Sequence, residues 1–505
     1  MGIFSQKIIA AMRILLINPK YPDTYWSFKY ALKFISKKAS NPPLGLLTVA
    51  SLLPGDWEKK LVDVNVCRLM EKDILWADLV FIGAMSIQQE SAREVIERCR
   101  LAGRKIVAGG PLFTGEPENY MDKVDHLVLN EAEITLPLFL KDLDEGRPGK
   151  IYKTDHHPEM DRSPQPDYSL IDVSKYAQLS IQYSRGCPYD CEFCEITALL
   201  GHKFRTKSTE QVLHELDNLY RTGFRGNVFF VDDNFIGNRR RLKRDLLPAL
   251  IGWAENHGYP FIYTTEASIN LADDPELMSL MVRAGFTKVF VGIETPDDTS
   301  LEECNKKHNR ERNLIDSVRK IQHEGMEVTA GFIVGFDSDT PGIFQRQIDF
   351  IQKSGIITAM VGLLNAPNNT RLFRRLSDEG RILEKHKGDN TSYTMNFIPK
   401  MDNEILLTGY QHIIQNIYSS RAYYERVVQF LKSYRPRVKL QTSISFDKIL
   451  ALLRSVFVIG VLNKNRIYYW KLFFWSLLNR PSTFSLAITY SIFGYHFRKV
   501  FRDIK

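Results

Sequence analysis

The sequence predicts an α/β protein in three parts: an N-terminal Rossmann-like domain, a central partial (β/α)6 barrel and a mostly helical C-terminal domain. Two series of short apolar runs, each alternating with segments of helical spacing, predict the first two parts, because strands of a buried parallel sheet are apolar throughout. From residue 367 the helical spacing continues to the end of the chain. The expected boundaries are 12–145 for the first domain, 146–176 for a linker, 177–366 for the barrel and 367–505 for the C-terminal domain.

The first domain is expected to form an open parallel sheet. Apolar runs that predict its strands lie at 14–17, 60–64, 79–84, 106–108 and 126–129. Segments such as 44–53 and 91–102 lie between these runs and have helical spacing. A sheet of this kind binds ligands where its parallel strands end. Small or polar residues stand at these ends, namely Asn18, Asp63, Asn65, Ser86, Gly109 and Gly110. The sequence therefore predicts a ligand site along this edge.

The second series of strands follows a stretch rich in Pro, Asp and Gly, which is expected to be a linker. Its apolar runs lie at 178–184, 227–231, 261–265, 288–293, 327–334 and 358–364. Helical spacing separates them, for example at 209–220. Six β/α units without a seventh and eighth predict an open barrel, whose site is expected where the strands end.

Three cysteines follow the first strand of this barrel directly. Cys187, Cys191 and Cys194 have the spacing C-x3-C-x2-C. Three thiolates on one short loop can hold three irons of a [4Fe-4S] cluster, which normally takes four cysteines. One iron would then keep an open position for a substrate or cofactor. The loop is therefore predicted to be a metal site with chemistry of its own.

The alternative is a structural zinc site with His202 or another, unidentified residue as the fourth ligand. The second half of a zinc knuckle is absent from the sequence, which favours the cluster. The remaining cysteines, Cys67, Cys99 and Cys304, are single and far apart. Six unevenly placed cysteines do not predict a disulfide framework, so a reducing compartment is expected.

The cysteine spacing is the signature of the radical S-adenosylmethionine (SAM) enzymes, and the chain resembles that family from this loop onward. The resemblance implies that SAM binds the open iron through its amino and carboxylate groups. It also implies that one electron from the cluster cleaves SAM to a 5′-deoxyadenosyl radical, which removes hydrogen from unactivated carbon. A reductant such as flavodoxin or ferredoxin would supply the electron.

Residues that match the family's SAM contacts follow the loop and the later strands. The resemblance implies that Phe193 and the glycine-bearing strand of Gly331 and Gly335 lie near the adenine. Polar residues at the ends of the second, third and fourth strands are candidates for the SAM ammonium group or the ribose. These candidates are Asp232, Asp233, Asn234, Glu266 and Glu294. Structural alternatives stay open: a loop anchor for Phe193, a helix N-cap for one residue of 232–234 and a bulge in the glycine-bearing strand.

The first domain resembles the cobalamin-binding module of one large radical SAM class. The matching pieces are 41–46, 63–65, 109–111 and 130–133. The resemblance implies cobalamin contacts at Asn18, Pro43, Leu44, Gly45, Asp63, Asn65, Ser86, Gly109, Gly110 and Glu131. Many cobalamin proteins carry D-x-H-x-x-G, but Asn65 stands where that histidine would fall and Arg68 where the glycine would be. We therefore expect no histidine on the lower face of the cobalt; a Rossmann-like domain that has lost this cofactor is the alternative.

The resemblance is most specific between residues 180 and 390. The segments 231–240, 292–296 and 365–372, with Glu379 and Arg381, resemble the subgroup of bacterial hopanoid methylases and archaeal enzymes that form rings in tetraether lipids. This resemblance implies that the protein is a C-methyltransferase that acts on an unactivated carbon of an apolar lipid or terpenoid. Two alternatives stay open: carbon–carbon coupling or ring formation without methyl transfer, and a cobalamin-binding sensor with a structural cluster.

The net charge of +8 is carried by residues 451–505, which hold nine Lys or Arg and one Asp. The same stretch holds 13 aromatic residues. This composition fits a helix lying in an anionic membrane interface or a helical subdomain that packs its aromatic side chains on the core. No apolar run reaches the roughly 18 residues of a spanning helix. We expect a cytoplasmic protein, or one peripheral on the inner face of the membrane, with no nucleic acid partner. Residues 1–11 are read as a leader or as a start displaced from Met12.

Overall fold

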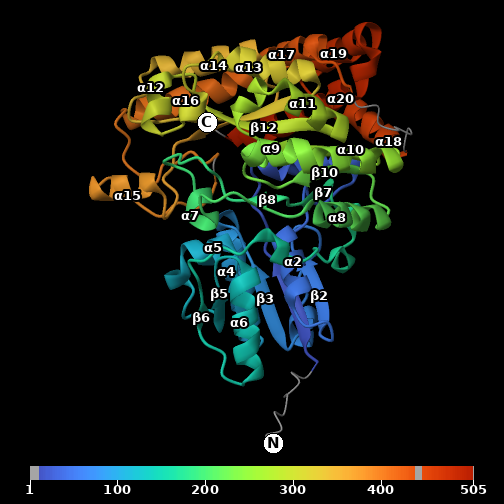
Figure 1. Ribbon diagram of the computed structural model, residues 1–505. Coiled ribbons are helices and arrows are strands. Elements are labelled where there is room, and N and C mark those ends of the chain that lie inside the picture. Colours follow the sequence, from blue (N-terminus) through green and yellow to red (C-terminus); the bar gives the residue numbers. More distant parts are fainter. Residues whose placement is uncertain (1–10, 390, 438–445, 504–505) are drawn as a thin grey trace, which may run out of the picture.

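The computed structural model describes residues 11–389, 391–437 and 446–503, and has three parts stacked from bottom to top in Figure 1. The first sheet lies at the bottom, the barrel lies above it, and the C-terminal helices cover the barrel. The question of a leader or displaced start lies outside the described residues, except for Ala11 and Met12. The predicted α/β class and the order of the three parts are confirmed.

The first sheet has six parallel strands in the order β2-β1-β3-β4-β5-β6. Its strands are β1 (Arg13–Asn18), β2 (Glu58–Asp63), β3 (Leu79–Gly83), β4 (Lys105–Gly109), β5 (His126–Val128) and β6 (Ile151–Tyr152). Its principal helices are α2 (Leu44–Leu52), α3 (Glu71–Trp76), α4 (Gln89–Leu101), α5 (Pro111–Gly115) and α6 (Ala132–Asp144). The order reverses between β1 and β3, and at such a point the loops diverge and leave a crevice at the ends of the strands.

Alternate side chains of β1 supply the two cores of this domain. Leu15 and Ile17 lie in one buried cluster with residues of α4, and Ile14 and Leu16 lie in another with residues of α2 and α6. Successive side chains of a strand point to opposite faces, so a strand covered on both sides must be apolar throughout. This explains why continuous apolar runs predicted these strands.

Strand β6 lies inside the segment expected to be only a linker. Ile151 and Tyr152 pair with β5 in parallel, and the Tyr152 ring lies 5.6 Å from that of Phe139 on α6. Two residues are too few for a recognisable periodicity, and only Tyr152 is buried. The sheet therefore extends one strand further than the sequence indicated.

The second sheet has six parallel strands that follow one another in chain order. They are β7 (Gln178–Ile181), β10 (Gly226–Phe230), β11 (Phe261–Glu266), β12 (Phe286–Glu294), β13 (Glu327–Val334) and β14 (Ala359–Leu363). The helices between them include α8 (Thr209–Arg221), α10 (Leu247–Asn256), α11 (Pro275–Ala284), α13 (Leu314–Glu324) and α14 (Gly342–Ser354). No pairing closes β7 on β14 among the described residues, so the predicted open, partial barrel is confirmed.

The C-terminal part consists of helices α15 (Arg371–Asp378), α16 (Asn403–Ile417), α17 (Ser420–Ser433), α18 (Phe446–Ser455), α19 (Arg466–Asn479) and α20 (Phe484–Val500). A π-helical turn, η12 (Val456–Val461), continues α18. Helix α20 also packs on the first domain, where the rings of Phe497 and Tyr25 stack at 4.4 Å. Within the described ranges, none of the helices combines the length and the apolar character that crossing a membrane requires.

Candidate active site

The cysteine loop lies between the two sheets, where the strands of both end. It joins β8 (Ser184–Arg185) to α7 (Ile196–Leu200), and both lie between the barrel and the first sheet in Figure 1. Arg185, just past β7, forms an ion pair of 2.8 Å with Glu131, just past β5. The carboxyl ends of the two sheets therefore face one another across this loop.

A short antiparallel ladder closes the base of the loop. Strand β8 pairs with β9 (Arg205–Thr206), so the single strand expected at 178–184 is in fact β7 followed by β8. Between ladder and cysteines, Gly186 has φ of +86°, and a Cβ there would lie 2.5 Å from the backbone oxygen of Lys203. Only glycine fits such a position. The backbone N–H of Cys194 donates to the oxygen of Cys191 at 3.1 Å, which brings the last two thiols onto one turn.

The three thiols are partly buried and none forms a disulfide. Burial raises the pKa of each, that of Cys194 to about 12. A buried thiolate needs a positive partner, and iron in a cluster supplies one while holding the thiol deprotonated. The residues therefore fit the cluster. His202, a possible fourth ligand in the zinc alternative, is exposed.

Asp232 holds the start of the cysteine loop. Its carboxylate accepts hydrogen bonds from the backbone N–H and the hydroxyl of Ser184, and from the N–H of Tyr183 at 3.2 Å. Burial raises its pKa to about 7. All three of these bonds go to the chain itself, so Asp232 positions the start of the loop. Its contact with SAM stays a prediction.

Asp233 and Asn234 lie beside the first cysteine. The side-chain amide of Asn234 and the charge of Asp233 both act on the pKa of Cys187, and the Asn234 oxygen accepts from the N–H of Ser268 at 3.2 Å. Oδ2 of Asp233 is buried without a hydrogen-bond partner, and burial raises the pKa of this acid to about 6. An unsatisfied buried carboxylate oxygen is costly, and a bound cationic group would satisfy it.

The two glutamates differ in their surroundings. Burial, followed by the charges of Asp233 and Asp232, raises the pKa of Glu266 to about 8. Glu294, in contrast, forms a buried ion pair with Lys306. Burial disfavours the charged form of Lys306, but the neighbouring Glu294 raises the pKa of Lys306 above its ordinary value. The charge of Lys306 in turn opposes the rise that burial causes in the pKa of Cys191. Lys306 is a site residue that no motif indicated, because it lies in a helix-to-turn segment without strand or glycine signals.

The remaining SAM candidates lie on or near β13. The Phe193 ring lies 6.4 Å from that of Phe336. Gly335 has φ of +106° and donates its N–H to Asp339 at 2.8 Å, and a Cβ on Gly331 would lie 3.1 Å from the ring of Phe290. Phe193 and Gly335 therefore lie near the end of β13, whereas Gly331 lies within the strand beside Phe290. The contacts of all three residues with SAM stay predictions.

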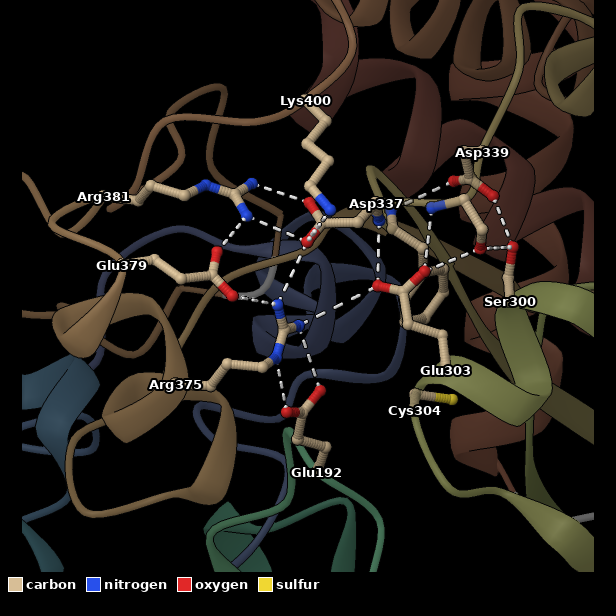
Figure 2. A network of polar contacts seen from close by, with 12 residues as sticks. Glu192, Ser300, Glu303, Cys304, Asp337, Asp339, Arg375, Glu379, Arg381 and Lys400 are labelled. Atoms are coloured by element: carbon tan, nitrogen blue, oxygen red, sulfur yellow. Dashed lines mark hydrogen bonds and ion pairs between the residues drawn. The ribbon is translucent and has the colours of Figure 1, made fainter.

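An ion-pair network joins the cysteine loop to the C-terminal part (Figure 2). Glu192, between Cys191 and Phe193, receives two hydrogen bonds from Arg375 of α15, at 2.7 and 3.2 Å. Arg375 and Arg381 both bond Asp337, after β13. Although burial favours the neutral acid, these bonds from Arg381 and Arg375 lower the pKa of Asp337 to about 2. The loop is thus fixed by charges contributed from α15 and from the end of β13.

On the facing edge of the first sheet, Asp63 organises the loops. Its Oδ1 accepts from the amides of Asn18 and Asn65 at 3.0 and 2.7 Å, and its Oδ2 from the hydroxyl of Tyr176 at 2.9 Å. The side-chain oxygen of Asn65 accepts from the N–H of Tyr21 at 2.8 Å. Asn65 is therefore engaged on both sides by the protein, which agrees with the absence of a ligating histidine at this position.

The other cobalamin candidates surround the same edge. A Cβ on Gly109 would lie 2.6 Å from the Val128 oxygen, and Gly110 has φ of +96°. Pro43 precedes α2, Leu44 and Gly45 begin it, and Gly45 has open space around it. Ser86 begins a 3-10 turn beside Gly388. A side chain at Gly109 or Gly110 would meet the backbone of Val128 or Ala84, so close packing within the first domain requires glycine at both positions. The contacts of these residues with cobalamin stay predictions.

Glu131 lies among three cationic or basic side chains, and its contact with cobalamin stays a prediction. Its two oxygens receive ion pairs from Arg185 at 2.8 Å and Arg205 at 2.9 Å, and His157 lies 2.8 Å away. These partners come from the segment between the sheets and from β9. The structure therefore places Glu131 at the junction of the two domains, with its oxygens directed at cations of the chain.

Comparison with known proteins agrees with this architecture. The sequence model of the radical SAM superfamily matches residues 181–351, and that of a domain of unknown function matches residues 370–505. An uncharacterized methyltransferase of Synechocystis sp. is 41% identical over 98% of this chain and 92% of its own length. The hopanoid C-2 methylase of Rhodopseudomonas palustris is 34% identical over 91% of this chain and 88% of its own.

Two solved structures share the fold. The cobalamin-dependent SAM radical enzyme OxsB, with aqua-cobalamin and SAM bound, aligns with a TM-score of 0.64 at 15% identity, over 98% of this chain and 80% of OxsB. The radical SAM methyltransferase TsrM from Kitasatospora setae, with cobalamin and a [4Fe-4S] cluster bound, aligns with a TM-score of 0.60 at 17% identity, over 88% of this chain and 96% of TsrM. At such identities the likeness concerns the fold.

Proposed function

This chain belongs to the radical SAM superfamily, and we propose that it is a cobalamin-dependent C-methyltransferase acting on an unactivated carbon of an apolar lipid or terpenoid. The observation that carries the proposal is the facing arrangement of the two sheets. The loop that bears the three cysteines joins β8 to α7, and both elements lie between the barrel and the first sheet. The ion pair between Arg185 and Glu131 spans the two parts beside this loop. The relation to hopanoid C-2 methylase over most of the chain supports the reaction class and the kind of substrate.

Cys187, Cys191 and Cys194 would hold a [4Fe-4S] cluster, and the first domain would hold cobalamin. When bound, the cluster with SAM supplies one-electron chemistry that removes hydrogen from carbon, and cobalamin supplies a transferable methyl group. The chain itself contributes position and charge. Asp232 holds the loop through three hydrogen bonds, and Asp233 directs an unpaired buried oxygen that suits the ammonium group of SAM.

The lower face of cobalamin is predicted to lack a protein ligand. Asn65 donates to Asp63 and to the Pro19 oxygen, and accepts from Tyr21. An amide held on both sides in this way orders the loops after β1 and β2. Held in this way, the Asn65 side chain is not free to reach a metal.

A lipid substrate, a peripheral location on the inner membrane face and a reductant such as flavodoxin or ferredoxin complete the proposal. The basic, aromatic C-terminal part supports the location. No general acid and base are required when a carbon–hydrogen bond is broken homolytically, because the hydrogen leaves with one electron. The carboxylates of Asp233 and Glu266 are proposed to bind SAM, because the Asp233 oxygen lacks a partner in the chain and Glu266 is buried beside it.

The test is anaerobic reconstitution with iron, sulfide and cobalamin, followed by incubation with methyl-labelled SAM, reductant and a hopanoid or terpenoid extract. We expect 5′-deoxyadenosine and label in the lipid fraction. Cys187→Ala should lose the cluster and both products, and Asp233→Asn should keep the cluster but raise the KM for SAM. A Cys187→Ala protein that retains a complete cluster and cleaves SAM would contradict the assignment.

Two other functions remain as outcomes of the same assay. Deoxyadenosine without label in the lipid would indicate coupling or ring formation, the chemistry of the predicted relation to tetraether ring-forming enzymes. Cobalamin binding without deoxyadenosine would indicate a sensor with a structural cluster. Methyl transfer is favoured because relatives at 41% and 34% identity bear the names methyltransferase and methylase.

A further inference from the structure

The outward face of α18, η12 and α19 is apolar, although it is exposed. We call it the C-terminal apolar face. It consists of Ile449, Leu453, Phe457, Val461, Leu462, Ile467, Phe474, Leu477 and Leu478, each at least 45% exposed. Scattered apolar residues are normal on a surface, whereas a contiguous group marks an interaction site.

Helical spacing places these side chains in two rows. On α19 the buried residues Tyr469, Leu472 and Ser476 face the core, and Ile467, Phe474 and Leu478 follow the opposite side at intervals of seven and four. On α18 and η12, Leu453 and Phe457 are four residues apart in the same way. Each helix thus has one apolar face buried and another that faces solvent.

Hydrogen bonds and close packing join the two helices. The hydroxyls of Ser455 and Tyr469 share a hydrogen bond of 2.9 Å, and the Trp470 indole N–H donates to the Gly460 oxygen at 2.9 Å. A Cβ on Gly460 would lie 3.1 Å from the Trp470 and Tyr469 rings, so the helices pack closely here. The end of α18 and the turn η12 therefore pack directly against the first turns of α19.

The charge on these elements is mostly positive. Between residues 446 and 503 the chain has nine Lys or Arg and two acidic residues, Asp447 in the first turn of α18 and Asp503. Lys464, Arg466 and Lys471 are exposed on the turn before α19 and on α19 itself. Lys471 lies on the row that contains Ile467 and Phe474, so positive charge is interspersed with the apolar side chains.

We propose that the C-terminal apolar face docks on an anionic phospholipid bilayer, with α18 and α19 lying in the plane of the membrane interface. Leucine, isoleucine and phenylalanine side chains enter the boundary between headgroups and acyl chains, and the basic residues meet lipid phosphates. A second copy of this chain fits less well, because it would bring basic residues against basic residues. The inference deepens the proposed function by naming its partner, and rests on that function only for the source of the substrate.

The test is sedimentation of the full-length protein with vesicles of phosphatidylcholine, alone or mixed equally with phosphatidylglycerol. The variant Leu453→Ser/Ile467→Ser/Leu478→Ser should bind the mixed vesicles about tenfold or more weakly, because buried apolar area contributes to interfacial binding. The variant Lys464→Gln/Arg466→Gln/Lys471→Gln should lose the preference for the anionic lipid. The matched control is Leu101→Ser/Leu383→Ser, which removes side chains that are 81% and 64% exposed elsewhere and should bind as the wild type does.

Circular dichroism and cluster absorbance identify any variant that fails to fold. Binding of the apolar variant at wild-type strength, or equal wild-type binding to both vesicles, would overturn the proposal. So would a concentration-dependent dimer that the apolar variant abolishes, because the face would then belong to a second copy. Since vesicle binding needs no turnover, an inactive wild type that still binds anionic vesicles would contradict the proposed function and leave the docking surface standing.

Discussion

Glu192 lies within the cysteine loop and is held by a side chain nearly two hundred residues further along the chain. Arg375 reaches it through two hydrogen bonds (Figure 2). Bidentate pairing of this kind fixes the direction of a carboxylate as well as its distance. Because Cys191 and Cys194 flank the residue, Arg375 is inferred to position two of the three thiols.

Replacing Arg375 should disturb the cluster more than the fold. Arg375→Gln removes both bonds to Glu192, each worth about 1.5–3 kcal/mol at most, and less here because the Arg375 side chain is 32% exposed. We expect less iron per protein after reconstitution and an altered electron paramagnetic resonance spectrum. SAM cleavage should be about tenfold slower, which corresponds to about 1.4 kcal/mol of activation free energy. Arg375→Lys should retain part of the wild-type iron content and rate, because lysine keeps the positive charge but cannot form two parallel hydrogen bonds to one carboxylate.

Arg374 offers the matched control, because it is the exposed neighbour on the same helix. Arg374→Gln should leave iron content, spectrum and rate unchanged. If Arg375→Gln also retains a full cluster with the wild-type spectrum, the loop is held without this ion pair.

The polar residues of the site show how far single positions could be predicted. The sequence located the cysteine loop, the edge at Asp63 and the strand ends at Asp232 and Asp233, because motifs and strand ends are local signals. It did not predict that Asp232 bonds the loop or that Glu131 pairs with Arg205, 74 residues away. A carboxylate suits a ligand and a backbone N–H equally well, so only the neighbours that folding brings decide between them.

At the scale of elements, the cysteine loop depends on the ladder of β8 and β9 and on the glycine that follows β8. Gly186→Ala should prevent the loop from closing. Its φ of +86° is strained for alanine, and the Cβ would lie 2.5 Å from the Lys203 oxygen. Strain of this kind costs about 1–3 kcal/mol before the clash is counted. We expect loss of iron binding, measured by absorbance after reconstitution, and a lower free energy of unfolding.

Gly103→Ala separates strain from clash. Gly103 has a similar φ of +67°, but no atom lies within 4 Å of a Cβ there. This variant should lose about 1 kcal/mol of stability and keep the cluster. A Gly186→Ala protein with normal iron content would show that the loop tolerates another path.

Elements with strong periodicity were predictable, and short ones were not. The strand expected at 327–334 coincides with β13, and the helix expected at 209–220 corresponds to α8 (Thr209–Arg221). Strands β6, β8 and β9 have two residues each. These short strands form because a neighbouring segment supplies backbone hydrogen-bond partners. The sequence of two residues carries no signal that identifies this partner.

At the scale of the whole molecule, contacts in several places join the first domain to the rest, and two of them lie at opposite ends of the junction. Glu131 meets Arg185 and Arg205 where the sheets face one another. On the outer side, Tyr25 of the first domain packs on Phe497 of α20, and Nε2 of His496 lies 2.9 Å from the Tyr25 oxygen. Because the proposed cofactors lie on opposite sides of the junction, their separation depends on these contacts.

His496 should make this second contact sensitive to acid. Its ring is fully buried. A carbonyl can only accept, so the neutral ring donates through Nε2, and Nδ1 lies buried without a partner. Burial lowers the pKa of His496 to about 4, although the Tyr25 oxygen and the charge of Asp23 oppose the shift. Protonation at Nδ1 would bury a second donor with nothing to accept from it.

The direction of the pH effect follows from the proton balance. Between pH about 6.5, the ordinary histidine value, and pH about 4, the unfolded chain binds a proton that the folded chain does not. The free energy of unfolding should therefore fall as the pH falls through this range, by up to about 3 kcal/mol from this group alone. Denaturant unfolding should show that the free energy of unfolding changes less between pH 7.5 and pH 5 in His496→Gln than in the wild type.

The matched control His412→Gln alters an exposed histidine, and its free energy of unfolding should change with pH as that of the wild type does. An equal pH dependence in His496→Gln and the wild type would mean that other groups govern the acid sensitivity, and that the α20 contact holds the first domain independently of protonation.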